Sequence, residues 1–227
     1  MHDDTTHPRC QYGGLDTTAG SHAETWDAFY DMSGHGGPVW SGHPNGSLVA
    51  EVTGLEPGTA LDVGCGEGAD AIWLAHQGWK VTALDPSAVA LDRAAIAAAE
   101  AKATITWVHG GLIETATQLG AFDLVSVHYG VVPLADQARA IRLLCRAVAP
   151  GGTLLVVHHE LDLAHDGHAG PGRADNLLPD DVAAQLTDEW QIKNHQRRAR
   201  PGASPLGTPD IRDIVLRAHR LEGPTTI

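Results

Sequence analysis

Short runs of apolar residues alternate along the middle of the chain with longer stretches in which apolar residues recur every three or four positions. The short runs have the length and continuity of strands buried on both faces of a parallel sheet, and the longer stretches have the period of amphipathic helices. This alternation predicts an α/β domain with a doubly wound sheet. The predicted strands cover residues 59–63, 79–85, 105–109, 121–127 and 153–157. The predicted helices cover residues 22–32, 46–52, 69–77, 87–102, 136–149 and 179–186.

Two further segments near the C-terminus, 189–198 and 212–219, alternate between apolar and polar residues and are joined by a link rich in Pro and Gly. This pattern predicts two more strands, which raises the sheet to seven. The triplet at 150–152, Pro-Gly-Gly, predicts a turn that ends the preceding helix before the fifth strand.

A glycine-rich turn follows the first predicted strand. Gly64, Gly66 and Gly68 crowd this turn, where glycine permits positive φ and lets a ligand approach the main chain. The helix that starts near Ala69 directs its free N–H groups toward the space beyond the turn. Asp85 follows Gly64 by about 20 residues, the spacing that brings a carboxylate beside a ribose diol in nucleotide-binding α/β units. We therefore predict a site for a nucleoside cofactor.

Two cofactor classes compete for this turn. Gly64, Gly66 and Ala69 also satisfy the G-x-G-x-x-A fingerprint of dinucleotide-binding proteins. Asp62 lies just before the first glycine, where its carboxylate would repel a pyrophosphate but would attract an ammonium group and a sulfonium. An NAD(P)-dependent oxidoreductase that uses the same turn is the first alternative, and a non-catalytic cofactor-binding homologue is the second.

The segment 62–68 (DVGCGEG), followed by a strand that ends in Asp-Pro at 85–86, resembles motifs I and II of the class I S-adenosylmethionine-dependent methyltransferases. The resemblance covers roughly residues 54–220. It implies a Rossmann-like doubly wound seven-stranded sheet with a C-terminal antiparallel strand pair, S-adenosyl-L-methionine as methyl donor and S-adenosyl-L-homocysteine as product. At matching positions it implies cofactor contacts from Asp62, Gly64, Cys65, Gly66, Asp85, Pro86, Gly111, Leu112 and His128.

One of these positions departs from the pattern of the class. Many members carry an acidic residue that accepts a hydrogen bond from the adenine amino group, and this chain has Gly111 there. The resemblance therefore implies that backbone groups hold the adenine edge at this position.

A narrower resemblance concerns the segments 26–30 (WDAFY), 40–45 (WSGHPN) and 61–74. They look like small bacterial methyltransferases of the tellurite-resistance and thiopurine methyltransferase-like group. That group acts on small molecules, often at soft S, Se or Te atoms. The likeness implies a bacterial enzyme with a small-molecule heteroatom acceptor (S, Se or Te, O or N).

Histidines end two of the predicted strands, on the side where open parallel sheets bind ligands. A thiolate acceptor needs little acid–base help, whereas a hydroxyl or an amine loses a proton and profits from a base. His128 and His159 are therefore candidate catalytic residues, with hydrogen bonding in the loops as the alternative.

The Gly- and Pro-rich loop at residues 33–45 is a candidate lid over the acceptor. Trp40, His43 and Asn45 in this loop are candidate substrate contacts. Tyr129 joins them, and packing is the alternative role for its ring.

The histidines also raise a metal hypothesis. His158, His159 and Glu160 are consecutive, with His165 and His168 nearby, and imidazole and carboxylate are common metal ligands. Neighbouring side chains of a strand point to opposite faces, however, and no paired metal-ligand spacing is present. We therefore predict no metal site.

Charge and composition narrow the partners and the location. The formal net charge is −13, from 28 acidic and 15 basic side chains, which disfavours nucleic acid and anionic membranes as partners. The N-terminus is polar and the sequence has no run of 18 apolar residues, so we expect neither a signal peptide nor a membrane span. The 3 cysteines show no paired spacing, which favours a reducing cytoplasm.

The same properties define the expected organisation of the chain. We expect a flexible tail at 1–20, N-terminal helices with the lid loop at 21–53, and the methyltransferase domain at 54–227. We expect a monomer or a homodimer.

Overall fold

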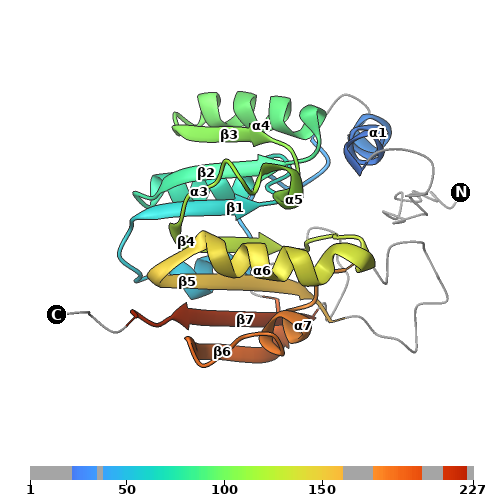
Figure 1. Cartoon of the computed structure of the whole chain (residues 1–227). Coiled ribbons are helices and arrows are strands. Elements are labelled where there is room, and N and C mark those ends of the chain that lie inside the picture. The colour runs from blue at the N-terminus through green and yellow to red at the C-terminus, as the bar shows by residue number, and fades with distance from the viewer. Residues whose placement is uncertain (1–21, 35–37, 161–175, 201–211, 224–227) are drawn as a thin grey trace, which may run out of the picture.

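The computed structural model describes residues 22–34, 38–160, 176–200 and 212–223. They form one seven-stranded sheet with the order β3-β2-β1-β4-β5-β7-β6 (Figure 1). β1 to β5 are parallel, and β7 runs antiparallel to both β5 and β6, which confirms the predicted fold class. The strands are β1 (Thr59–Val63), β2 (Lys80–Asp85), β3 (Ile105–His109), β4 (Phe122–His128), β5 (Val148–His159), β6 (Trp190–Ala199) and β7 (Arg212–Arg220).

Helices cover both faces of this sheet. The helices are α1 (His22–Gly34), α2 (Gly46–Val52), α3 (Ala69–His76), α4 (Ala88–Glu100), α5 (Leu112–Thr115), α6 (Gln137–Ala147) and α7 (Pro179–Ala183), and a 3₁₀ turn, Leu134–Asp136, precedes α6. Two of them start at a capping side chain. Asn45 accepts from the Ser47 N–H ahead of α2, and Ser87 accepts from the Ala90 N–H ahead of α4.

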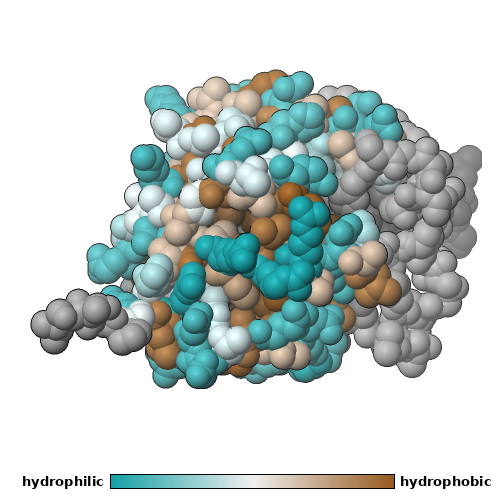
Figure 2. All heavy atoms as spheres, viewed as in Figure 1, coloured by the Kyte–Doolittle hydropathy of each residue, from teal (hydrophilic) through white to brown (hydrophobic). Residues whose placement is uncertain are grey.

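Side chains that alternate along the strands pack into two hydrophobic cores, one on each face of the sheet. In β1, Ala60 belongs to the core that α2 and α3 cover, whereas Leu61 and Val63 belong to the core that α5, α6 and α7 cover. Burying one large aliphatic side chain such as Leu61 contributes about 2 kcal/mol. Figure 2 shows the face over α6, where hydrophilic side chains dominate and hydrophobic ones are scattered. The continuously apolar runs in the sequence are thus explained by burial on two sides.

The fifth strand differs from its prediction. β5 begins at Val148, which pairs with Phe122 of β4, so the predicted turn at 150–152 lies inside the strand. The pairing register shifts between Phe122 and Leu124, because Val148 pairs with Phe122 and Thr153 with Leu124, while the residues between them, including the Pro-Gly-Gly segment, have no partner on β4. The predicted tail at 1–20 and residues 35–37 of the predicted lid loop lie outside the described residues.

The strand order places the ends of four strands around one crevice. β1 pairs with β2 on one side and with β4 on the other, so the connections diverge between β1 and β4. Such a switch point is where open α/β sheets bind ligands. Asp62, Asp85, His128 and His159 lie at or next to the carboxyl ends of β1, β2, β4 and β5, as the sequence predicted.

Candidate active site

The glycine turn after β1 is anchored to β2. The N–H groups of Gly64 and Cys65 both donate to the Leu84 carbonyl, at 2.9 and 3.0 Å, and the Gly66 N–H donates to Asp85 Oδ2 at 2.8 Å. Gly66 has a φ of +53°, and a Cβ built on it would lie 2.9 Å from the Tyr30 hydroxyl. Both the backbone conformation and the close cover above it therefore require glycine at this position.

Asp85 presents a carboxylate that is held in place but not saturated. Its two oxygens each accept one backbone N–H, from Ser87 and from Gly66. A carboxylate has about four acceptor positions, so positions remain for a ribose diol. Burial raises the pKa of Asp85, and the two backbone N–H donors counteract part of that rise.

Asp62 is buried and only half satisfied. Its Oδ1 accepts from the Ser126 hydroxyl at 3.1 Å, whereas its Oδ2 has no hydrogen-bond partner. Burial, and then the neighbouring Asp70 carboxylate, raise the pKa of Asp62 well above its usual range. A buried carboxylate oxygen without a partner is costly, and a cationic group of a ligand would remove that cost. The residues around the turn therefore fit a cofactor with a positive charge near Asp62.

The N-terminal segment lies against the same turn. Both oxygens of Glu67 accept from the backbone N–H groups of Val39 and Trp40, and Arg93 pairs with Glu67 at 2.9 Å. The Trp40 indole donates to the Tyr30 hydroxyl at 3.1 Å. These contacts place the two aromatic rings over Gly66, so Trp40 and α1 cover the glycine turn, and the predicted lid over the acceptor stays a prediction.

α1 is also attached to the helix after β2. The Asp27 carboxylate accepts from the Ser87 hydroxyl at 2.6 Å and from the Val89 N–H at 3.2 Å. These bonds join α1 to the first turn of α4, next to Asp85.

The remaining predicted cofactor residues contribute mainly through the backbone. Burial raises the pKa of the Cys65 thiol well above its usual range, so the thiol stays protonated, and the main chain of Cys65 is hydrogen-bonded to Leu84 and Gly68. Pro86 accepts from the His109 ring through its carbonyl, at 3.1 Å. Gly111 caps α5, and a Cβ there would collide with the Glu114 carboxylate. The Glu114 carboxylate thus lies beside Gly111, while Leu112 packs in the core, and the backbone contact to adenine stays a prediction.

Tyr129 connects several segments at the other side of the crevice. It has a φ of +54°, a conformation that costs a non-glycine residue about 1–2 kcal/mol. Its hydroxyl accepts from Asn45 Nδ2 at 2.9 Å and donates to the buried Asp213 at 3.3 Å. Burial, and then Asp213, raise the pKa of Tyr129, so its hydroxyl stays protonated. A strained aromatic residue with a defined hydrogen-bonding role is typical of a ligand site.

His159 lies parallel to the Tyr129 ring, with 4.1 Å between the ring centres. Arg200 Nη2 is 2.6 Å from His159 Nδ1, whereas the Asp213 carboxylate is 3.6 Å from the same nitrogen. Because arginine can only donate, Nδ1 is the acceptor and the proton of the neutral ring resides on Nε2. In this arrangement His159 offers a donor toward a ligand, so its role as a base does not follow from the geometry.

Asp213 and Arg200 support this ring pair. Arg200 Nη2 donates to Asp213 Oδ1 at 3.0 Å, and its guanidinium lies 4.9 Å from the centre of the Tyr129 ring. Burial raises the pKa of Asp213, but its contacts with His159 and Arg200 outweigh burial and lower the pKa.

His128 ends β4 between these two halves of the crevice. Its side chain is 7% exposed, and neither ring nitrogen has a hydrogen-bond partner. Nδ1 lies 3.4 Å from Asp70 Oδ2, within ion-pair range. Burial lowers the pKa of His128, against the opposing charges of Asp70 and Asp213, so the ring is neutral at neutral pH.

The structure thus brings together most of the predicted residues, and others that the sequence did not single out. His43 is exposed, and its backbone N–H donates to the Ser41 hydroxyl at 3.2 Å. Asp70 directly follows the glycine motif and was not distinguished from it. Asp213 lies in a strand with alternating polar and apolar residues, where a polar residue gives no signal of a site. The residues that sequence reasoning missed are Tyr30, Glu67, Asp70, Arg200 and Asp213.

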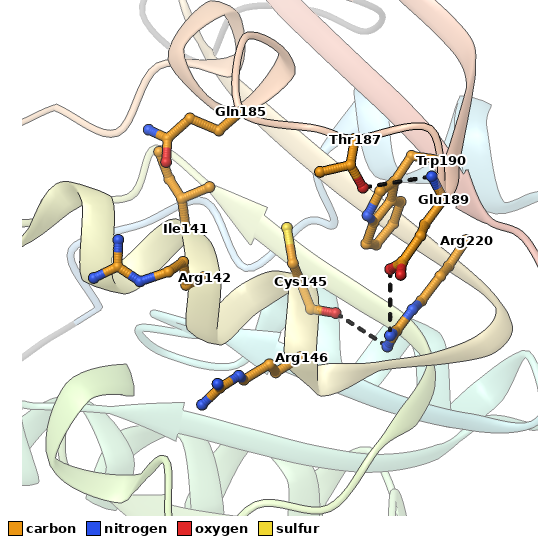
Figure 3. A pocket seen from close by; sticks show the side chains of 9 residues that line it. All are labelled: Ile141, Arg142, Cys145, Arg146, Gln185, Thr187, Glu189, Trp190 and Arg220. Atoms are coloured by element: carbon orange, nitrogen blue, oxygen red, sulfur yellow. Dashed lines mark hydrogen bonds and ion pairs between the residues drawn. The ribbon is translucent and has the colours of Figure 1, made fainter.

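The cavity in Figure 3 lies elsewhere. It has a volume of 240 Å³ and is lined by residues of α6, of the segment before β6 and of the end of β7, at the opposite ends of the strands. Arg142 and Arg146 point away from its centre, toward which the Cys145 thiol is directed. We therefore place the candidate site at the crevice and not in this cavity.

The described residues contain neither a group of metal ligands nor a helix that could span a membrane. Within ranges 22–34, 38–160, 176–200 and 212–223, no three His, Cys, Asp or Glu side chains are grouped so that they could hold a metal ion. His165 and His168 lie outside these ranges. No helix in the described part of the chain is long and apolar enough to cross a membrane.

The strand order, the glycine turn and the two acidic strand ends define the fold of the class I S-adenosylmethionine-dependent methyltransferases. Comparison with known proteins agrees, because residues 60–152 match the family model described as a methyltransferase domain. An uncharacterized methyltransferase of Mycobacterium tuberculosis is 38% identical over 111 residues, which cover 49% of this chain and 55% of that protein. A ubiquinone biosynthesis O-methyltransferase of a Methylobacterium species is 38% identical over 95 residues, 41% of this chain and 38% of that protein. The chain thus spans about half or less of the curated relatives it matches.

Solved structures extend the likeness to nearly the whole fold. One solved structure was reported for the conversion of a disulfide bond into a thioacetal group during echinomycin biosynthesis. It has a TM-score of 0.66 and 25% identity, over 88% of this chain and 93% of that chain. The N-methyltransferase NodS from Bradyrhizobium japonicum, in complex with S-adenosyl-L-homocysteine, has a TM-score of 0.56 and 23% identity, over 78% and 84% of the two chains. These matches do not confirm the narrower resemblance to the tellurite-resistance and thiopurine group.

Proposed function

We propose that the protein transfers a methyl group from S-adenosylmethionine to a heteroatom of a small-molecule acceptor. The observation that carries this proposal is the buried Asp62 oxygen without a partner beside a glycine turn, because the cofactor brings an ammonium group that would satisfy it. In this arrangement Asp62 holds the ammonium group and Asp85 the ribose diol. The turn at Gly64 and Gly66 provides the close approach. When bound, the cofactor supplies an electrophilic methyl group on a positively charged sulfur.

The acceptor is proposed to lie over Tyr129, between His128 and His159. The stacked pair of rings gives a flat polarizable surface, and the His159 Nε2–H offers a hydrogen bond. Catalysis would come largely from positioning the two reactants, with the segment at residues 38–45 helping to exclude water. The names of the relatives and neighbours include an O-methyltransferase and an N-methyltransferase, so similarity alone does not select the acceptor atom.

Cofactor binding provides the first test. Calorimetric titration with S-adenosylhomocysteine should show binding to the wild-type protein, and Asp62→Asn should weaken it by about 2 kcal/mol, roughly 30-fold, because a charge-assisted hydrogen bond is lost. The matched control is Asp92→Asn on the exposed side of α4, which should leave the affinity unchanged. Binding of NADH with no binding of S-adenosylhomocysteine would instead support the oxidoreductase alternative.

Turnover provides the second test. Release of S-adenosylhomocysteine should be measured with thiols, selenite, tellurite, phenols and amines, each with and without a chelator. The proposal expects turnover with one of these classes and no effect of the chelator. Cofactor binding without turnover on any acceptor would favour a non-catalytic cofactor-binding protein.

A further inference from the structure

The imidazole of His128 has an unusual position for a histidine. It is buried and without a hydrogen-bond partner, at the end of the central strand beside the proposed acceptor position. Buried polar side chains are nearly always paired, and those that are not are retained where a ligand or a reaction needs them. The tyrosine and the second histidine of the crevice are both engaged in hydrogen bonds, so His128 is the ring there with free acceptor capacity.

Asp70 is fixed so that one of its oxygens faces this ring. It belongs to the first turn of α3, and its Oδ1 accepts from the Asn45 N–H at 2.6 Å. Its Oδ2 is 3.4 Å from His128 Nδ1. A carboxylate beside one ring nitrogen places the proton there and leaves the lone pair on the other, as in acid–base pairs of hydrolytic enzymes. Contacts of this kind are often long without a ligand and shorten in the reacting complex.

We propose that Asp70 and His128 act as a proton-accepting pair, and that the methyl acceptor is a hydroxyl group, which loses its proton to this pair. The choice of acceptor rests on the proposed function, whereas the pair itself does not. Asp70 is a positioning residue, and His128 is the catalytic residue.

The proposed step is balanced without any further reactant. The hydroxyl oxygen forms a bond to the methyl carbon while the bond between that carbon and sulfur breaks, and its electron pair stays on sulfur. The hydroxyl proton moves to His128 Nε2. The positive charge that the ring gains is compensated by the Asp70 carboxylate at Nδ1.

The environment of His128 affects how readily the ring accepts a proton. Burial lowers the pKa of the His128 ring, and the charge of Arg200 lowers it further. The charges of Asp70 and Asp213 raise the pKa, but burial prevails, so His128 is a weak base. A phenol, with a pKa of about 10 as in tyrosine, can transfer its proton to such a base during bond formation. A soft thiolate would not need the base at all.

The pair can be tested without cofactor or acceptor. In protein labelled with ¹⁵N-histidine, the nitrogen shifts of His128, assigned from their loss in His128→Gln, should show the proton on Nδ1. Asp70→Asn should shift the balance toward Nε2. A proton on Nε2 in the wild-type protein, or a tautomer that Asp70→Asn does not change, would overturn the pair.

Kinetics test the acceptor class and the roles. With catechol or 1-naphthol as acceptor, His128→Gln should lower kcat about 100-fold with little change in KM. The acid limb of the kcat profile should shift to lower pH in Asp70→Asn, because a carboxylate that raises the pKa of His128 is removed; a purely structural role would not move the limb. The control His195→Gln, in the His195–Asp180 pair outside the crevice, should change neither value.

Two outcomes separate this proposal from the proposed function. Turnover of thiophenol but of no phenol, unaffected by His128→Gln, would overturn the acceptor class while supporting methyl transfer. Failure of every acceptor would count against both the function and the acceptor class, and the tautomer measurement would then decide the pair alone.

Discussion

Single residues in this protein show how burial changes acid–base behaviour in opposite directions. Burial raises the pKa of Asp62 and Asp85, and it lowers the pKa of His128 and His158, because in each case the charged form loses its hydration. A ligand that carries charge of the right sign reverses such a shift. The carboxylates therefore favour a cationic ligand, and the histidines remain neutral proton acceptors.

His158 allows this effect to be measured as stability. Its pKa falls to about 4, so below pH 6.5 the unfolded chain binds a proton that the folded chain does not. The resulting stability is complete above pH 6.5 and is lost as the pH falls toward 4, by about 3 kcal/mol. Urea unfolding at neutral pH and near pH 4.5 should show the advantage of wild type over His158→Gln shrinking at the lower pH. An equal advantage at both pH values would contradict the prediction.

At the level of elements, α2 is attached to the terminal strand pair through one buried carboxylate. Glu51 accepts from Asn194 at 2.8 Å and pairs with Arg198 at 2.7 Å and with Arg217 at 3.5 Å, and its side chain is 6% exposed. α2 begins at Asn45, which also contacts Tyr129 and Asp70, so this attachment positions the crevice.

Glu51→Ala should therefore destabilise the protein by about 3 kcal/mol, because it leaves the half-buried guanidinium groups of Arg198 and Arg217 without their carboxylate partner. Urea denaturation measures this loss, and hydrogen exchange should show it concentrated in β6 and α2. Glu56→Ala, at an exposed position ahead of β1, is the control and should cost little. A loss below about 1 kcal/mol for Glu51→Ala would show that the carboxylate does not hold these elements together.

The elements themselves could be predicted well from the sequence, and the site only in part. Strands such as β1 and helices such as α2 have the predicted bounds, because burial on both faces and capping leave local signals. Asp62 and Asp85 belong to a local motif and could be predicted for the same reason. Asp213 and Arg200 could not, because they meet His159 only when β7 inserts beside β5. The start of β5 was predicted too late for a related reason, since the pairing of Val148 with Phe122 lies before the Pro-Gly-Gly segment and is non-local.

At the scale of the whole molecule, the charge distribution opposes polyanions. The net charge is −13, and the arginines of the terminal strands are each paired with a carboxylate. These are Arg197, Arg198, Arg212, Arg217 and Arg220, together with Arg200 after β6.

We therefore expect labelled single-stranded RNA or duplex DNA to bind more weakly than about 100 µM at an ionic strength of about 0.15 M. Fluorescence anisotropy should give the same result with and without S-adenosylhomocysteine. Salt-dependent binding at low micromolar concentration would contradict this prediction and would point to a macromolecular acceptor.

The strand order also limits the sequence of events in folding. β7 follows β6 in the chain but lies between β5 and β6 in the sheet. β6 pairs with β7 and with no other strand among the described residues, so it cannot join the sheet while β7 is still unformed. Two routes of refolding remain. In one, the hairpin of β6 and β7 forms first and then docks on β5 as a unit; in the other, β7 docks first and β6 stays unpaired until it has done so. The pairing of β7 with β5 joins residues that are far apart in the sequence, and such non-local pairing is slow. We therefore expect the docking of β7 on β5 to limit the rate of folding.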